Sequence, residues 1–114
     1  MVPLNVIEVR EYIDRKGRNP FRQWFEELDG GTRARVSVAL DRLGRGNISP
    51  VKGVGAGVFE LRMDFGPGYR AYFGKDGDRI VILLAGGTKK RQQNDIDTAS
   101  ALWREYKEQK RQER

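Results

Sequence analysis

The chain has 114 residues and a formal net charge of +6, from 22 Lys and Arg against 16 Asp and Glu. It has no Cys and no His, which excludes disulfides, thiolate zinc sites and histidine as a general base or metal ligand. No apolar run approaches the length of a membrane span, and the N-terminus lacks the apolar stretch of a signal peptide. We therefore expect a single cytoplasmic domain with no membrane partner.

The first half of the chain predicts one strand and two helices. Residues 4–12 are rich in β-branched side chains, which favours a strand. Asn19 can cap a helix that has Pro20 at its first position. The apolar stripe of that helix is formed by Phe21, Trp24, Phe25 and Leu28. Residues 29–32 break the pattern, and a second helix is predicted over about 33–43.

The second half predicts three further strands and a final helix. Residues 44–57 are rich in glycine and predict a loop. Residues 58–73 alternate between apolar and polar on both sides of a Gly-Pro-Gly turn, which is typical of a strand hairpin. Residues 79–85 contain an unbroken apolar run after Arg79, so this strand should be central and end at the following pair of glycines. The last helix is predicted to begin near Asp95.

The order β-α-α-β-β-β-α predicts an α+β domain in which a small, mostly antiparallel sheet carries helices on one side. We expect residues 1–109 to form this single domain. Residues 110–114 are too polar to pack, so they are expected to be a frayed basic tail.

The hairpin of residues 58–73 predicts its own register, because both of its apolar sets must face the same core. This register pairs Leu61 with Ala71, Arg62 with Arg70 and Glu60 with Tyr72. Two arginines directly opposite each other destabilise a hairpin by about a few tenths of a kcal/mol or more. Such a pair favours an anion that both guanidinium groups can bind.

Other basic residues gather in the loops beside this hairpin, and an excess of positive charge favours a polyanionic partner such as nucleic acid. The candidate nucleic-acid contacts are Lys52, Lys89, Lys90 and Arg91, together with Tyr69 and Tyr72 as rings on which bases could stack. Gly86 and Gly87 would permit a close approach of the backbone to a phosphate. The alternative interpretation is a solvated surface, on which Glu60 and Asp64 pair with the two hairpin arginines.

Three segments resemble a known group of proteins. They are residues 59–73 with the Phe-Gly-Pro-Gly-Tyr-Arg motif, residues 83–89 with Gly-Gly-Thr-Lys, and residues 93–96. They are similar to the HigB-like branch of the RelE/ParE toxin superfamily, the phage-derived group often called addiction-module killer proteins. The resemblance covers nearly the whole chain and implies a RelE/ParE-like fold, with a compact antiparallel sheet and two N-terminal helices.

What the resemblance implies is a toxin of a type II toxin–antitoxin pair, with RNA-binding and endoribonuclease activity. Such mRNA interferases inhibit translation by entering the ribosomal A site, where a 2′-hydroxyl of the mRNA attacks its adjacent phosphate. The implied partners are a helix-turn-helix, HigA-like antitoxin, the ribosome and mRNA. The toxin would be a monomer alone or part of a heterotetramer with its antitoxin, and no cofactor or metal is implied.

The resemblance also implies roles for individual residues. Arg70 falls on the phosphate-stabilising arginine of the family, and Arg62 on a basic active-site position. Lys89 stands where RelE has another catalytic arginine, and Lys52 at a loop position that is basic in several relatives.

The proton acceptor stays open. Glu60 has suitable chemistry, Lys52 or Lys89 with a lowered pKa would also serve, and the ribosome could instead orient the RNA without a strong base. Two other functions are also compatible with this fold. One is a ParE-like inhibitor that binds DNA gyrase, and the other is an inactive toxin-like domain that acts only with its antitoxin.

Overall fold

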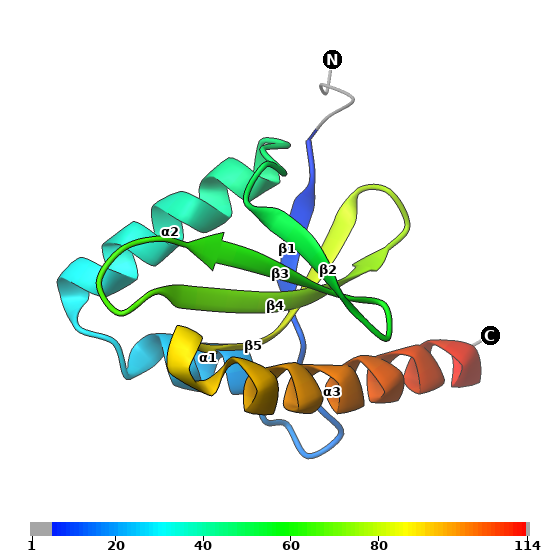
Figure 1. The fold of residues 1–114 in the computed structure, drawn as a ribbon. Helices are drawn as coiled ribbons and strands as arrows, with labels where there is room; N and C mark the ends of the chain where they lie inside the picture. Colours follow the sequence, from blue (N-terminus) through cyan, green and yellow to red (C-terminus); the bar gives the residue numbers. More distant parts are fainter. Residues whose placement is uncertain (1–5, 114) are drawn as a thin grey trace.

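The computed structural model describes residues 6–113, and this part of the chain contains five strands, three α-helices and one 3₁₀ helix (Figure 1). The elements are β1 (Glu8–Glu11), α1 (Pro20–Glu26), α2 (Gly30–Gly44), β2 (Val51–Gly55), β3 (Val58–Met63), β4 (Tyr69–Asp76), β5 (Ile80–Thr88), η1 (Lys89–Arg91) and α3 (Gln92–Gln112). Within these residues no helix has the length and apolar character needed to cross a bilayer.

The strands form one sheet in the order β1-β5-β4-β3-β2. β1 runs parallel to β5, and the other neighbours are antiparallel, which confirms the mixed α+β class and the mostly antiparallel sheet. The register predicted for the hairpin is also confirmed, since Arg62 pairs with Arg70 and Glu60 with Tyr72. The two arginines therefore extend from directly opposite positions of β3 and β4.

Several predicted boundaries were wrong. The glycine-rich segment contains strand β2, which pairs with β3 and adds an edge to the sheet. Residues 29–32, predicted to separate the two helices, contain the start of α2. The side chain of Asp29 accepts a hydrogen bond from the backbone N–H of Thr32 and caps that helix. The capping of α1 was predicted correctly: the side chain of Asn19 accepts a bond from the backbone N–H of Arg22.

The last helix begins earlier and ends later than its polar sequence indicates. It starts at Gln92 and runs to Gln112, into the segment expected to fray. Gln109 donates to the hydroxyl of Tyr12 at 3.0 Å, and the ammonium of Lys110 lies 3.4 Å from the carboxylate of Asp76. These contacts hold the polar end of the helix against the sheet. The part of the first predicted strand at residues 4 and 5 lies outside the described residues.

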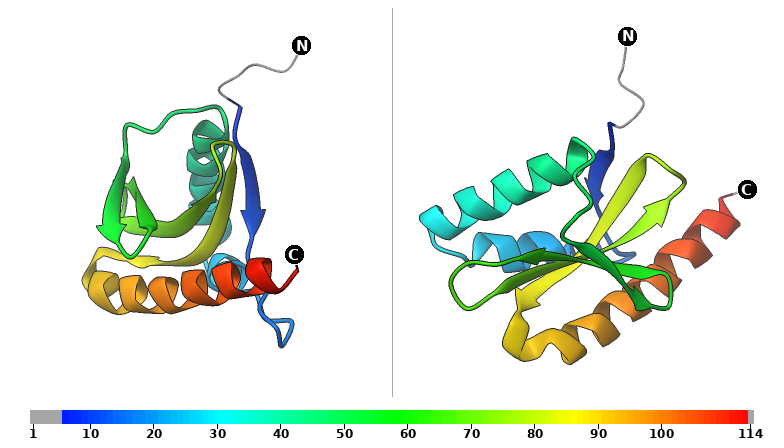
Figure 2. Two further views of the ribbon diagram at one scale, coloured as in Figure 1. Left: turned by 90° about the vertical axis from the view of Figure 1, so that its right-hand side faces the viewer. Right: turned by 45° about the horizontal axis from the view of Figure 1, so that its top comes forward.

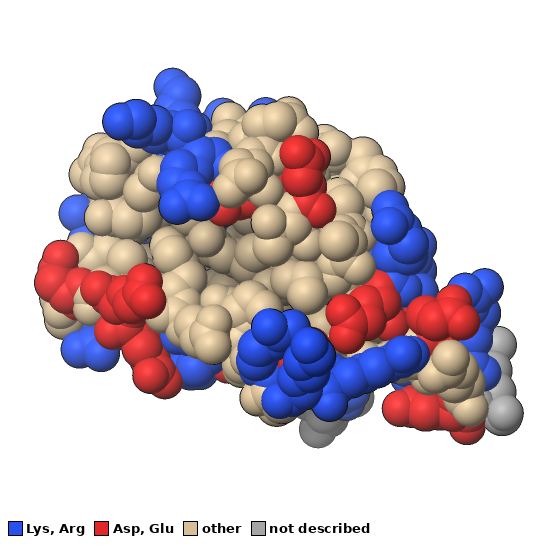
Figure 3. Space-filling model, turned by 90° about the horizontal axis from the view of Figure 1, so that it is seen from below, with Lys and Arg blue, Asp and Glu red and all other residues tan. Residues whose placement is uncertain are grey.

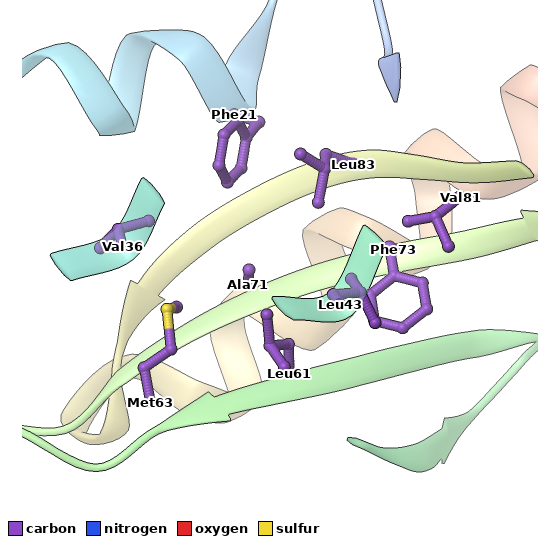
Figure 4. Close-up of a cluster of buried hydrophobic side chains, with 9 residues drawn as sticks. All are labelled: Phe21, Val36, Leu43, Leu61, Met63, Ala71, Phe73, Val81 and Leu83. Atoms are coloured by element: carbon purple, nitrogen blue, oxygen red, sulfur yellow. The ribbon is translucent and has the colours of Figure 1, made fainter. Parts of the chain in front are cut away.

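Helices cover both faces of the sheet, so the prediction of helices on one side was wrong. One layer of the core joins α1 and α2 to the sheet (Figure 4); its buried members are Phe21, Val36, Leu43, Leu61, Met63, Ala71, Phe73, Val81 and Leu83. The second layer joins Trp103 and Ala99 of α3 to the opposite face. Figure 2 shows α3 lying across the sheet, on the other side from α2. The hairpin face that carries Glu60 and Arg70 is therefore largely covered.

A bulge in β5 decides which residues face α3. The register between β4 and β5 shifts between Tyr72 and Phe73, which leaves Leu84 without a partner in β4. Leu84 and the next residue, Ala85, both pack in the α3 layer. The bulge thus reverses the alternation of faces beyond it, so that Gly87 lies beneath α3.

Gly74→Ala should destabilise the protein strongly, because a Cβ at this position would lie 2.3 Å from the Trp103 ring. We expect the free energy of unfolding to fall by about 1–3 kcal/mol or more from overpacking, measured by urea denaturation. Gly53→Ala is the matched control, since its Cβ would have 3.9 Å to the nearest atom, in the Phe59 ring. Equal stability of the two variants would contradict the packing of α3 on β4.

Candidate functional site

The centre of the site is a carboxylate buried between the sheet and α3. Glu60 is only 1% exposed and lies in β3, opposite Lys52 of β2 and Tyr72 of β4. Its Oε2 accepts a hydrogen bond of 2.7 Å from Nε2 of Gln92. Its Oε1 lies 3.8 Å from the Lys52 ammonium and 3.5 Å from Nε of Arg70. A buried carboxylate needs such compensation, so Glu60 joins three strands to the start of α3.

Arg70 is 5% exposed, and its charge is balanced by Glu60 within the protein. Its Nη1 also donates to the carbonyl oxygen of Tyr69, at 3.0 Å. The expectation that both hairpin arginines stand open to an anion is therefore wrong for Arg70. Arg62, its cross-strand partner, is different: its side chain is 52% exposed, and it lies 3.4 Å from the exposed carboxylate of Asp64.

Two further polar groups are buried beside this pair. The hydroxyl of Tyr72 and Oδ2 of Asp95 have no hydrogen-bond partner among the described residues. Burial raises the pKa of Tyr72, and the charges of Glu60 and Asp95 raise it further. Burial also raises the pKa of Asp95, against the opposing effect of Arg91. We call Glu60, Arg70, Tyr72, Gln92 and Asp95 the buried polar cluster.

Exposed cations lie on β2, β3 and η1, the elements next to this cluster. We call this set the cationic rim; it consists of Lys52, Arg62, Lys89, Lys90 and Arg91. Lys89 is brought to the hairpin by its backbone N–H, which donates to the carbonyl oxygen of Gly68 at 2.7 Å. A Cβ on Gly68 would lie 3.4 Å from Cβ of Lys89 and 3.5 Å from Nη1 of Arg70. The loop after β5 and the start of β4 therefore place Lys89 and Arg70 side by side.

The two tyrosines do not serve as open stacking surfaces, so that part of the prediction was wrong. Tyr72 is fully buried beneath α3. Tyr69 faces the opposite layer, where its ring centroid lies 5.1 Å from that of Phe65 and 6.3 Å from that of Trp24. Both rings pack in the core, because a large aromatic side chain removes a large apolar area from water when it is buried.

Gly86 and Gly87 do permit a close approach, but the approaching groups belong to the protein. A Cβ on Gly86 would lie 2.1 Å from the Trp24 ring, and one on Gly87 would lie 1.9 Å from Oδ2 of Asp95. The bulge in β5 sets these directions. The space at Gly86 is thus filled by Trp24 of α1 and the space at Gly87 by Asp95 of α3, so a phosphate does not fit there.

The residue that sequence reasoning missed is Gln92. It lies 32 positions from Glu60 in the chain, and a glutamine at the start of a polar helix carries no distinguishing pattern. Basic and acidic side chains share the surface seen from below, in separate groups of each sign (Figure 3). Within residues 6–113, no group of three or more His, Cys, Asp or Glu residues could hold a metal ion.

Taken together, the fold and the site define a small, basic α+β protein whose exposed cations lie beside a charge-balanced interior cluster. Residues 23–104 match the family described as Phage derived protein Gp49-like (DUF891), so the chain belongs to this family. The family is part of the addiction-module killer and RelE-like toxin group. The chain is also similar to an uncharacterized protein of Haemophilus influenzae, 40% identical over 86 residues that cover 75% of this chain and 87% of that protein.

Asp95→Asn should change how stability depends on pH. Because burial raises the pKa of Asp95 above its ordinary value, the charged form opposes folding. Relative to the variant, the wild-type protein should lose stability as the pH rises from about 4 through the raised pKa of Asp95. Urea denaturation at several pH values measures this difference. Parallel curves for the two proteins would contradict the buried position of the carboxyl group.

Proposed function

We propose that this chain is the toxin of a type II toxin–antitoxin pair and that it cleaves mRNA on the ribosome. The proposal is supported by membership of a family in the RelE-like toxin group. The single observation that carries it is the convergence of cations at one end of the hairpin, where Arg62 lies opposite Arg70 and Lys89 lies beside Gly68. Its partners would be a helix-turn-helix, HigA-like antitoxin, the ribosome and mRNA, all in the cytoplasm.

The cationic rim would bind the RNA backbone. When a 2′-hydroxyl attacks its adjacent phosphate, negative charge increases on the phosphate oxygens. Fixed cations at those oxygens lower the barrier, because they stabilise the transition state more than the ground state. Arg62 and Lys89 have the exposure and the position for this role. Lys52 would bind the neighbouring nucleotide, and its ammonium group lies 3.8 Å from the carboxylate of Glu60.

Arg70 would act at the inner side of the phosphate. The contacts with Glu60 and with the Tyr69 carbonyl fix its guanidinium, which leaves further N–H groups for an anion. A phosphate that binds there competes with Glu60 for the same charge. Arg70 therefore contributes orientation, and the exposed cations contribute most of the net positive charge.

Glu60 is better suited to position Arg70 than to accept a proton. It is 1% exposed and already has Gln92, Arg70 and Lys52 as partners, so a substrate hydroxyl has little access to its oxygens. A general base must lie within hydrogen-bond reach of the proton that it accepts. The proposed mechanism accordingly depends on orientation of the RNA by the ribosome, and no residue of this chain is assigned as base.

Arg62→Ala should lower cleavage by about 10²-fold, the usual effect of losing one group that stabilises developing charge. The measurement is single-turnover cleavage of mRNA on programmed ribosomes, with Arg70→Ala as a second variant. Arg104→Ala, an exposed change on α3, is the matched control and should cleave normally. Full activity of Arg62→Ala, or equally fast cleavage of free RNA, would contradict the proposed mechanism.

Glu60→Gln separates a positioning role from a general base. If Glu60 only positions Arg70, the pH profile of cleavage keeps its shape while the protein loses stability, by about 3–5 kcal/mol for a broken buried ion pair. If Glu60 accepts the proton, the acidic limb of that profile disappears. The two measurements are the pH dependence of single-turnover cleavage and urea denaturation of the same sample.

One observation favours a second function, a ParE-like inhibitor that binds DNA gyrase. Glu60 and Arg70 neutralise each other in the interior, as they would in a protein that uses this pair only for stability. The ribosome assay is therefore run beside a gyrase supercoiling assay. Inhibition of gyrase without cleavage of mRNA would establish the second function, and the absence of both activities would indicate an inactive toxin-like domain.

A further inference from the structure

Gln92 is the first residue of α3, and its side chain reaches back to the sheet. Its Nε2 donates to Oε2 of Glu60 at 2.7 Å. A charged carboxylate only accepts hydrogen bonds, so the N–H end of the amide must face it. The turn before Gln92 is fixed to the hairpin, because the backbone N–H of Lys89 donates to the carbonyl oxygen of Gly68 at 2.7 Å. The backbone therefore brings Gln92 to Glu60.

The two carboxylate oxygens of Glu60 have different partners. Oε1 faces the cations, at 3.5 Å from Nε of Arg70 and 3.8 Å from the ammonium of Lys52. Oε2 accepts the bond from Gln92, which is the hydrogen bond that Glu60 accepts within residues 6–113. Glu60 is 1% exposed, so it has little access to water. If Oε2 lost this donor, another group of the protein would have to replace it.

Lys52 is the group with the freedom to do so. Its side chain is 59% exposed, and its ammonium stands at the end of a flexible four-carbon stem. At 3.8 Å from Oε1, it is farther away than a hydrogen bond allows. Arg70 is less free, because it is 5% exposed and its Nη1 donates to the carbonyl oxygen of Tyr69. Without Gln92, the ammonium of Lys52 would therefore move inward to Oε2.

We propose that Gln92 is a positioning residue for Lys52 and acts through Glu60. By satisfying Oε2, Gln92 keeps the ammonium of Lys52 at the surface, where it meets a phosphate of the nucleic-acid backbone. An uncharged side chain thus controls how many cations the cationic rim presents. The inference rests on the proposed function only in taking RNA as the polyanion that Lys52 binds.

The test measures how binding of a single-stranded DNA of about ten nucleotides depends on salt. This probe has phosphates but no 2′-hydroxyl, so the proposed reaction does not cut it. Lys52→Ala removes one phosphate contact and should lower the slope of log affinity against log salt by about 0.7–1. Gln92→Ala should lower the slope equally. Gln93→Ala is the matched control and should keep the wild-type slope, since Gln93 donates to the exposed Asp97.

A double variant separates positioning from general damage to the fold. If Gln92 acts through Lys52, Gln92→Ala has no further effect on DNA binding once Lys52 has been replaced by alanine. Damage to the rest of the cationic rim would instead add to the effect of Lys52→Ala. Thermal unfolding of each variant checks that the fold is kept.

Gln92→Glu gives a variant that pH should rescue. The new carboxyl group would lie beside Glu60, and two adjacent carboxylates do not both ionise readily, so its pKa should rise above about 4.3. The other charged and titratable groups around Glu60 are Lys52, Arg70, Tyr72 and Asp95. The two cations stabilise the charge of Glu60, which leaves the shared proton on the new group. Protonated, this group donates to Oε2 as the amide does; ionised, it does not.

We therefore expect Gln92→Glu to bind DNA like the wild-type protein near about pH 5 and like Gln92→Ala near about pH 8. The wild-type protein is measured at each pH as the reference, because the phosphodiester charge of the probe is the same at both values.

Four results would overturn the proposal: equal slopes for the wild-type protein and Lys52→Ala, a wild-type slope for Gln92→Ala, an equal loss in Gln93→Ala, or additive losses in the double variant. A Gln92→Glu variant that follows the wild-type protein at both pH values would also overturn it. Because DNA binding is measured without cleavage, these results are distinct from failure of the proposed function. A chain that shows the expected binding and cuts no mRNA would lose only the proposed function.

Discussion

Two arginines that face each other across β3 and β4 would repel, and the structure depends on how that repulsion is relieved. Arg70 turns to the buried Glu60, and Arg62 pairs with the exposed Asp64. Each charge thus has its own counterion, one inside and one outside. This division makes one arginine part of the interior and leaves the other on the surface. It also requires α3, since Gln92 satisfies the second oxygen of Glu60.

The parts of the fold that were predicted from sequence are those encoded by short-range pattern. The alternation in residues 58–73 predicted the hairpin register, and the Asn19 cap predicted where α1 begins. The last helix was predicted, but its place on the opposite face of the sheet was not, because Glu60 and Arg70 on that face are charged. Charged residues at alternate positions normally face solvent, and no local pattern distinguishes that arrangement from a buried, paired one.

The missed strand β2 and the wrong end of β5 both come from glycine residues that were interpreted as signs of a loop. Residues 51–55 form β2 because β3 offers an open edge, and their own composition favours a loop. Gly86 and Gly87 were expected to end β5, but the strand continues through them because they pair with Ala71 and Arg70 of β4. Their missing side chains leave room for Trp24 and Asp95. Each glycine of this pair marks a place where a side chain approaches the backbone closely. Only the tertiary structure identifies what approaches.

The burial of Arg70 bears directly on what the site can do. A guanidinium that Glu60 and a backbone carbonyl already hold loses little conformational freedom on meeting a phosphate, which favours precise orientation. The same pairing lowers its net attraction for an anion, because Glu60 cancels much of its charge. Attraction must then come from the exposed cations, above all Arg62.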